Sequence, residues 1–189
     1  LYESKGEEIM VMDKHLMGKG LAKVVFAASQ DQTRPALSGI LIKEVEEEGK
    51  TSLLMVATDG YRLSLKKNPL EKKEKSKIEV SMLVPSRVIR ELLVLSKSMD
   101  EVGVFTSKEN NQIMFCQNDT TLVGRLIEGE FPQFEKIIPS DFSTKTEFDK
   151  EALQKAVKAC YVFARSAANI VKLSIKKEKI IVYVNAPSV

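Results

Sequence analysis

The sequence of 189 residues contains one histidine, two cysteines and no tryptophan. The single histidine, His15, argues against a multi-histidine metal site and against histidine-based catalysis. Cys116 and Cys160 lie on separate predicted elements without metal-ligand spacing, and we interpret both as buried, reduced thiols. No apolar run approaches the roughly 20 residues of a membrane-spanning helix, and nothing near Leu1 resembles a signal peptide. We therefore expect a cytoplasmic protein and, because the first residue is not methionine, part of a longer chain.

Positive charge is concentrated in three amphipathic segments, Lys14–Ser29, Pro85–Ser98 and Lys150–Ser166. Each combines an apolar helical face with basic residues at helical spacing. Together they hold ten basic and two acidic residues, a net charge of +8, whereas the whole chain has +3 and the remainder therefore −5. A phosphate backbone is the commonest partner of repeated basic faces, although such faces can also be merely solvated.

A strand, a helix and a run of strands recur at intervals of about 70 residues. We predict that Asp13 and Asp149 cap helices and that Lys66–Lys77 is an exposed loop. An α+β fold follows, with helices on one face of antiparallel sheets and their basic faces turned away. The third unit has only two strands after its helix, so we expect residues 144–189 to pack poorly alone. The predicted strands are Glu8–Met12, Leu37–Val45, Thr51–Ala57, Tyr61–Leu65, Ile78–Leu83, Val102–Thr106, Gln112–Cys116, Thr121–Leu126, Thr144–Phe148, Val171–Ile175 and Ile180–Val184.

Three segments carry a resemblance to a known family. They are RPALSGILI (Arg34–Ile42), VATDGYRLSL (Val56–Leu65) and RLIEGEFPQFEKIIP (Arg125–Pro139). In order and spacing they resemble the bacterial DNA polymerase III beta subunits, the sliding clamps, over essentially the whole chain. The resemblance implies the DNA-clamp fold, with residues 1–140 as the family's middle domain and residues 141–189 as the first half of its last domain. The prolines of Arg125–Asp141 fix extended backbone, which suits a domain boundary.

The resemblance also implies a function in DNA replication. Sliding clamps are homodimeric rings that encircle duplex DNA without reading its sequence, and they act as non-catalytic processivity factors for the replicative polymerase. The implied partners are double-stranded DNA, the DNA polymerase III catalytic subunit, the clamp loader and other clamp-motif proteins, with no cofactor, metal or membrane. The implied DNA-facing residues are Lys19, Lys23, Arg34, Arg87, Arg90, Lys97, Lys155, Lys158 and Arg165.

Partner proteins of the family insert a short hydrophobic motif between the middle and last domains. By resemblance, this chain supplies Leu37, Thr58, Gly60, Tyr61, Arg62, Leu63 and Pro139 to that pocket. Some family members carry histidine where this chain has Tyr61. Without the resemblance, Asp59-Gly60 would be interpreted as a hairpin turn, and Leu37 and Leu63 as core.

Val162 and Phe163 align with the family's subunit interface but could equally be core residues. Because the first domain of the family is absent from this sequence, we do not expect the chain to close a ring by itself.

Two other functions remain open from the sequence. A non-ring adaptor could bind peptides through its strands while its basic helices contact RNA or acidic proteins. An enzyme could use Asp59, Tyr61 and Arg62 as an active cluster, but the sequence has neither a phosphate-binding glycine loop nor a nucleophile–histidine arrangement.

Overall fold

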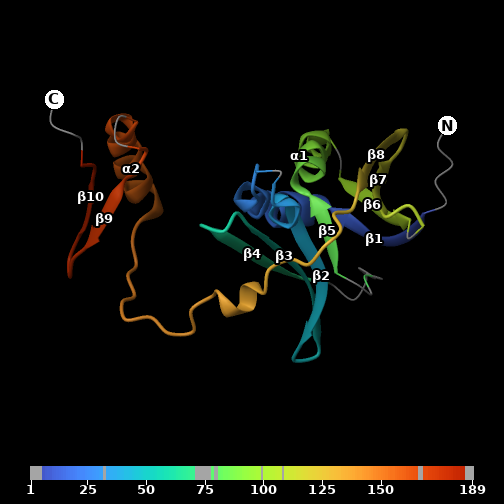
Figure 1. Cartoon of the computed structure of the whole chain (residues 1–189), viewed down its shortest axis with the longest axis horizontal. Coiled ribbons are helices and arrows are strands. Elements are labelled where there is room, and N and C mark those ends of the chain that lie inside the picture. The colour runs from blue at the N-terminus through green and yellow to red at the C-terminus, as the bar shows by residue number, and fades with distance from the viewer. Residues whose placement is uncertain are drawn as a thin grey trace. The chain divides into compact units, whose positions relative to one another are not determined.

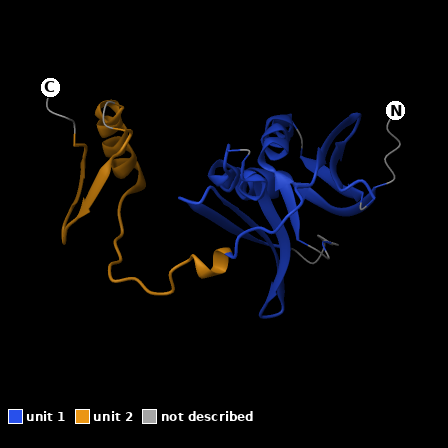
Figure 2. Cartoon of the chain, viewed as in Figure 1, with its two compact units in different colours: residues 1–133 blue, residues 134–189 orange. Residues whose placement is uncertain are grey.

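A computed structural model of the chain describes residues 6–31, 33–70, 78, 81–98, 100–107, 109–165 and 168–185. The chain divides into two compact units, residues 1–133 and residues 134–189 (Figure 2). The division falls before the predicted domain limit at Ser140.

Unit 1 consists of two repeats of one strand–helix–strands plan. Repeat A contains β1 (Glu7–Asp13), the short helices η1 (Leu16–Gly20), η2 (Leu21–Lys23), η3 (Val25–Ala27) and η4 (Pro35–Ser38), and the strands β2 (Gly39–Glu47), β3 (Lys50–Thr58) and β4 (Leu63–Pro69). Repeat B contains β5 (Met82–Pro85), α1 (Ser86–Leu95), η5 (Ser96–Ser98), β6 (Glu101–Ser107), β7 (Gln112–Gln117) and β8 (Thr120–Arg125). Unit 2 contains η6 (Phe134–Lys136), α2 (Lys150–Ala164), β9 (Lys172–Ile175) and β10 (Ile180–Tyr183).

The two repeats of unit 1 exchange their leading strands, the strands that precede each helical segment. The sheets have the orders β1-β6-β7-β8 and β4-β3-β2-β5, and every neighbouring pair is antiparallel. Leading strand β1 pairs with β6 of repeat B, with Asp13 opposite Glu101. Leading strand β5 pairs with β2 of repeat A, with Pro85 opposite Gly39. Each sheet is therefore completed by a strand from the other repeat.

The helical segments of unit 1 lie next to one another over the sheets, as Figure 1 shows for α1 and the helices that follow β1. Ile89 and Leu92 of α1 are 0% and 1% exposed and belong to one core with the inner residues of both sheets. Burial of these apolar side chains holds the helix layer on the sheets. The predicted packing of helices on one face of antiparallel sheets is confirmed.

The segment Lys14–Ser29 is not the continuous helix that the sequence predicts. Asp13 does cap the segment, because the backbone N–H of Leu16 donates to Asp13 Oδ1 at 2.6 Å. A π-helical turn and two 3₁₀ turns then replace a continuous α-helix. A Cβ atom at Gly20 would lie 3.2 Å from Met55 Sδ, so glycine lets this backbone approach β3 closely. The close packing against the sheet and the low helix propensity of glycine account for the broken helix.

Several other predicted boundaries need correction. The strand expected at Tyr61–Leu65 begins at Leu63 and continues to Pro69, so the first part of the predicted loop Lys66–Lys77 is strand; residues 71–77 lie outside the described residues. Pro85 ends β5 instead of starting the helix, with φ −54° and ψ 131°. Of the predicted strand Ile78–Leu83, only its last two residues lie in β5, and residues 79 and 80 are outside the described part.

The predicted strand Thr144–Phe148 is also wrong, because these residues form no ladder with β9 or β10. Asp149 caps α2 as predicted, accepting the backbone N–H of Ala152 at 2.7 Å. The thiols of Cys116 and Cys160 are free, but both residues are half-buried instead of buried. The remaining predicted strands and the helix α2 are confirmed within a few residues.

Candidate functional site

One face of α1 is cationic and its opposite face is core. Arg87 and Lys97 are exposed, and Val94 between them is 61% exposed. Ile89 and Leu92 face the sheets. α1 and the η5 turn that follows it thus present Arg87, Val94 and Lys97 to solvent, as the periodicity of the segment predicts.

The η1–η2 segment carries Lys19 and Lys23, which are both exposed, beside α1. The Ser64 hydroxyl donates to the carbonyl oxygen of Lys23 at 2.6 Å, which fastens this segment to β4. No ion pair is recorded between another described residue and any of the four cations Lys19, Lys23, Arg87 and Lys97. Their charges are therefore not neutralised by acids of the described chain.

Arg90 differs from its predicted role, because it is half-buried and ties the two helical segments together. Its Nη1 donates to Ser86 Oγ and its Nη2 to the carbonyl oxygen of Val25, each at 3.3 Å. That carbonyl also accepts the backbone N–H of Ala28 at 3.3 Å within the turn, so the guanidinium gives it a second hydrogen bond. We infer that Arg90 positions α1 against η3 and has fewer donors left for a ligand.

Arg34 is not on a helix face. Its Nε lies 3.6 Å from Asp31 Oδ2, and its Nη1 lies 3.6 Å from where a Cβ of Gly60 would be. The side chain and backbone N–H of Thr33 both donate to Asp31 and hold the pKa of that carboxyl below its ordinary value, with a smaller contribution from Arg34. Arg34 therefore borders the 58–63 loop and has an ion-pair partner in Asp31.

In unit 2, α2 repeats the cationic face. Lys155, Lys158 and Arg165 are exposed, whereas Leu153 and Ala164 lie on the less exposed side of the helix. No ion pair with a described residue is recorded for these three cations either. The spacing Lys155–Lys158–Val162–Arg165 equals that of Arg87–Arg90–Val94–Lys97 in α1.

The 58–63 loop, which is the turn between β3 and β4 together with the strand residues Thr58 and Leu63 on either side, is held by hydrogen bonds among its own residues. The Thr58 hydroxyl donates to the carbonyl oxygen of Arg62 at 2.8 Å and accepts the backbone N–H of Gly60 at 3.1 Å. Asp59 Oδ1 accepts the backbone N–H groups of Tyr61 and Arg62 at 2.9 and 3.0 Å. Gly60 has a φ of +92°, which the tight turn requires and most side chains disfavour. The loop is therefore preorganised.

The Arg62 side chain is fixed from two sides. Its Nε donates to Asp59 Oδ2 at 3.0 Å, and its guanidinium carbon lies 5.7 Å from the ring centroid of Phe26. The backbone N–H groups of Arg62 and Tyr61, together with the Arg62 charge, lower the pKa of Asp59 below its ordinary value. A general base needs a pKa near the working pH, so this shift has the wrong direction for the enzyme hypothesis.

The other predicted pocket residues are partly accessible. Leu37 and Leu63 are half-buried, which contradicts their interpretation as core, and Thr58 is 4% exposed. Tyr61 is 95% exposed at the tip of the loop. Pro139 belongs to unit 2, and its place in a pocket with these residues of unit 1 stays a prediction. Sequence reasoning missed Phe26, which is 55% exposed; the only signal was an aromatic residue within a basic segment.

Val162 and Phe163 are each 67% exposed, so neither is a core residue of unit 2. Their predicted role in a subunit interface stays a prediction.

Comparison with known proteins identifies the family. The sequence model described as "DNA polymerase III beta subunit, central domain" matches residues 11–133. This chain belongs to the DNA polymerase III beta subunit family. The predicted family and its clamp fold are therefore confirmed.

The relatives of this beta-subunit chain include named sliding clamps. It is 32% identical to the beta sliding clamp of Streptococcus pneumoniae over 95% of its own length and 46% of that protein. It is 29% identical to the beta sliding clamp of Staphylococcus aureus over 82% of this chain and 39% of the relative. The chain thus spans about half the length of the curated relatives it matches.

Solved structures of beta subunits resemble this chain over nearly its whole length. The DNA polymerase III beta chain of S. pneumoniae superposes with a TM-score of 0.84 at 30% identity, covering 99% of this chain and 48% of that one. The beta subunit from DNA polymerase of Streptococcus pyogenes superposes with a TM-score of 0.83 at 28% identity, covering 100% of this chain and 49% of that one.

Among the described residues, no cluster of three or more histidine, cysteine, aspartate or glutamate side chains is placed to hold a metal ion. No helix in the described part of the chain is both long enough and apolar enough to cross a membrane.

Proposed function

We propose that this chain forms half of a protomer of a DNA-encircling clamp, a non-catalytic processivity factor that tethers the replicative polymerase. The observation that supports this most is the pair of neighbouring cationic segments in unit 1, whose cations have no acidic partners among the described residues. A layer of lysine and arginine side chains on the solvent side of the helical segments attracts phosphates without reading bases.

The contacts should be individually weak. Lys19, Lys23, Arg87 and Lys97 are long, exposed side chains, and exposed ion pairs contribute about 1 kcal/mol or less each. Weak contacts allow the protein to move along the duplex, so a closed ring, not affinity, would retain it.

The ring proposal predicts that retention depends on DNA topology. We would replace the matching half of the S. pneumoniae clamp with this chain, load the chimera on nicked circular DNA and separate bound from free protein by gel filtration. The chimera should remain on circular DNA and leave the DNA once it is linearised. Equal loss from circular and linear DNA would exclude encirclement and favour the non-ring adaptor, provided that the parent S. pneumoniae clamp is retained in the same assay.

We also propose that the 58–63 loop and Leu37 form one wall of a pocket for short hydrophobic partner peptides. Leu37 and Leu63 supply apolar surface, while Arg62 is held by Asp59 and Phe26 at the rim. Because this chain contains only part of the family's pocket, binding should be weaker than micromolar.

Substitution of Asp59 tests whether the preorganised loop matters for the peptide. Asp59→Ala removes the acceptor of two backbone N–H groups and of Arg62 Nε, so peptide affinity measured by calorimetry should fall about tenfold. Asp59→Asn is the matched control, because its amide oxygen can still accept the backbone N–H groups of Tyr61 and Arg62. It should retain most of the affinity. Equal affinity of the alanine variant and the unsubstituted chain would show that the loop is not part of the binding site.

A further inference from the structure

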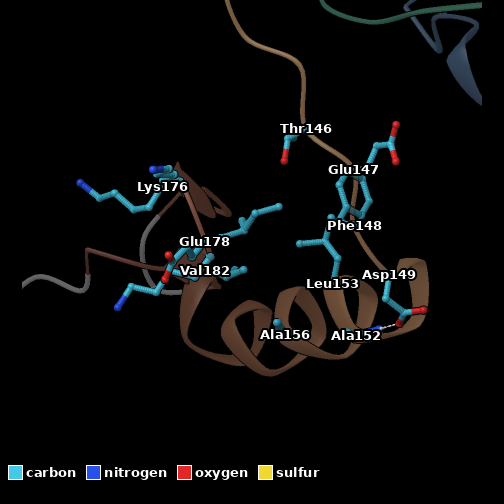
Figure 3. A pocket seen from close by; sticks show the side chains of 13 residues that line it. Thr146, Glu147, Phe148, Asp149, Ala152, Leu153, Ala156, Lys176, Glu178 and Val182 are labelled. Atoms are coloured by element: carbon cyan, nitrogen blue, oxygen red, sulfur yellow. Dashed lines mark hydrogen bonds between the residues drawn. The ribbon is translucent and has the colours of Figure 1, made fainter.

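The two parts of the proposed peptide wall come from different parts of unit 1. Leu37 lies in η4, before β2, whereas the 58–63 loop joins β3 to β4. A pocket with a volume of about 470 Å³ belongs to unit 2, where Figure 3 shows Phe148 and Leu153 on one side of it and Val182 on the other. That pocket contributes nothing to the peptide wall, which is held together by contacts within unit 1.

The segment of residues 23–29, which contains η3, is hydrogen-bonded to both parts of the wall. The backbone N–H of Ser29 donates to the carbonyl oxygen of Leu37 at 2.8 Å. At the other end of the segment, the carbonyl oxygen of Lys23 accepts the hydroxyl of Ser64, the residue that directly follows the loop, at 2.6 Å. The 23–29 segment therefore connects the two parts of the wall.

The same segment is anchored on the core. Val25 and Ala27 of η3 are 8% and 0% exposed. The carbonyl oxygen of Val25 accepts both Nη2 of Arg90 and the backbone N–H of Ala28, each at 3.3 Å. Phe26 lies between the two buried residues and is 55% exposed. Its ring therefore projects towards solvent from a backbone that is fixed on both sides.

The projecting ring of Phe26 meets Arg62 of the loop. The guanidinium carbon of Arg62 lies 5.7 Å from the ring centroid of Phe26, which is within the range of a cation–π interaction. Nε of Arg62 donates to Asp59 Oδ2 at 3.0 Å, and no hydrogen bond from its two Nη atoms to another described residue is recorded. The guanidinium is thus oriented from two sides, while its terminal N–H groups can donate to oxygen atoms of a ligand.

We propose that Phe26 is a positioning residue of the peptide site and acts through Arg62. Its ring holds the guanidinium at the rim of the wall, where the Nη groups donate to oxygen atoms of a bound peptide. A long side chain that is already held in place loses less conformational entropy when the ligand binds. The inference rests on the proposed peptide pocket, and it assigns to that pocket a residue from the helical layer.

Calorimetry of the whole chain with a synthetic clamp-motif peptide of the DNA polymerase III catalytic subunit tests the proposal. Phe26→Leu keeps an exposed apolar side chain but removes the aromatic ring, so peptide affinity should fall about two- to fivefold. Phe26→Tyr is the matched control, because it keeps a ring beside the guanidinium and should bind as the unsubstituted chain does.

The outcomes of this titration separate the inference from the pocket on which it rests. Equal affinities of Phe26→Leu and the unsubstituted chain, or an equal loss in Phe26→Leu and Phe26→Tyr, would overturn the positioning role and leave the pocket standing. No binding by the unsubstituted chain at millimolar peptide would contradict the pocket itself, and the inference with it.

A double-mutant cycle distinguishes positioning from direct contact between Phe26 and the peptide. In a chain that carries Arg62→Gln, the ring has no cation to hold, so adding Phe26→Leu should change peptide affinity by less than about 1.5-fold. If the two substitutions multiply their separate effects instead, Phe26 contacts the peptide itself and the positioning role is wrong.

The side-chain Nε–H resonance of Arg62 gives a readout that needs no peptide. The aromatic ring shifts the resonances of nearby protons, so Phe26→Leu should move this signal in the free chain more than Phe26→Tyr does. A signal that Phe26→Leu leaves in place would show that the ring does not hold the guanidinium, and would also overturn the proposal.

Discussion

A chain carrying Arg87→Glu and Lys97→Glu will lose most of its affinity for duplex DNA, by about 100-fold at low salt. Both side chains are exposed, Arg87 on α1 and Lys97 on the η5 turn that follows it, and neither has an ion pair with another described residue. Each phosphate contact that is lost reduces the slope of log K against log salt by about 0.9. Fluorescence anisotropy with a labelled duplex over a salt series should therefore show a slope smaller in magnitude by about 2.

The matched control reverses two exposed cations outside the helix faces. Lys50 and Lys179 lie at strand ends, Lys50 beside the β2–β3 turn and Lys179 beside the β9–β10 turn. Lys50→Glu with Lys179→Glu gives the same net charge as the helix variant but should change DNA affinity much less. An equal loss would mean that total charge, and not the arrangement of the helices, determines binding.

Ile89→Ala will reduce the free energy of unfolding of unit 1 by about 2–5 kcal/mol. Ile89 is 0% exposed and lies in the core that joins α1 to both sheets. Its truncation removes apolar contact and leaves a cavity that a close-packed core fills only in part. Urea unfolding followed by circular dichroism should show a lower transition midpoint.

Val94→Ala on the same helix is the control for this truncation. Val94 is 61% exposed, so Val94→Ala should alter the free energy of unfolding by no more than about 0.5 kcal/mol. The substitution also raises helix propensity slightly. If Ile89→Ala and Val94→Ala lowered the free energy of unfolding equally, α1 would not be packed on the core through Ile89.

The sequence was sufficient to predict α1 because its apolar and basic residues alternate at a strict helical period. Ile89 and Leu92 are buried, and Arg87 and Lys97 are exposed, as that period requires. The same reasoning failed for Arg90, because its position on the helix predicts a solvent-exposed side chain. Its Nη2 donates to the carbonyl oxygen of Val25 in η3, a contact between distant parts of the sequence that the helical period does not predict.

The irregular helix itself depends on tertiary contact. The apolar period of residues 14–29 fits an α-helix. The reason for the π-helical and 3₁₀ turns appears only in the structure, where Gly20 packs closely against Met55 of β3. The missing strand at Thr144–Phe148 has a related cause. Its alternation suits a strand, but a strand forms only where a neighbour supplies hydrogen bonds, and the described residues offer none.

The 58–63 loop could be proposed as part of a peptide pocket from sequence only through the family resemblance. The Asp-Gly pair indicates a turn but says nothing of what lies beside it. Phe26 and Arg62 are far apart in sequence and meet because Ser64 of β4 is bonded to Lys23, next to the short helices.

The exchange of leading strands in unit 1 has a consequence for synthesis on the ribosome. β1 ends at Asp13, yet its neighbour β6 begins only at Glu101. The first strand of unit 1 to leave the exit tunnel therefore has no strand partner while most of the unit is translated. Such distant closure slows folding and exposes an edge to other nascent chains, so slowing elongation within repeat B should make the newborn protein depend more heavily on chaperones.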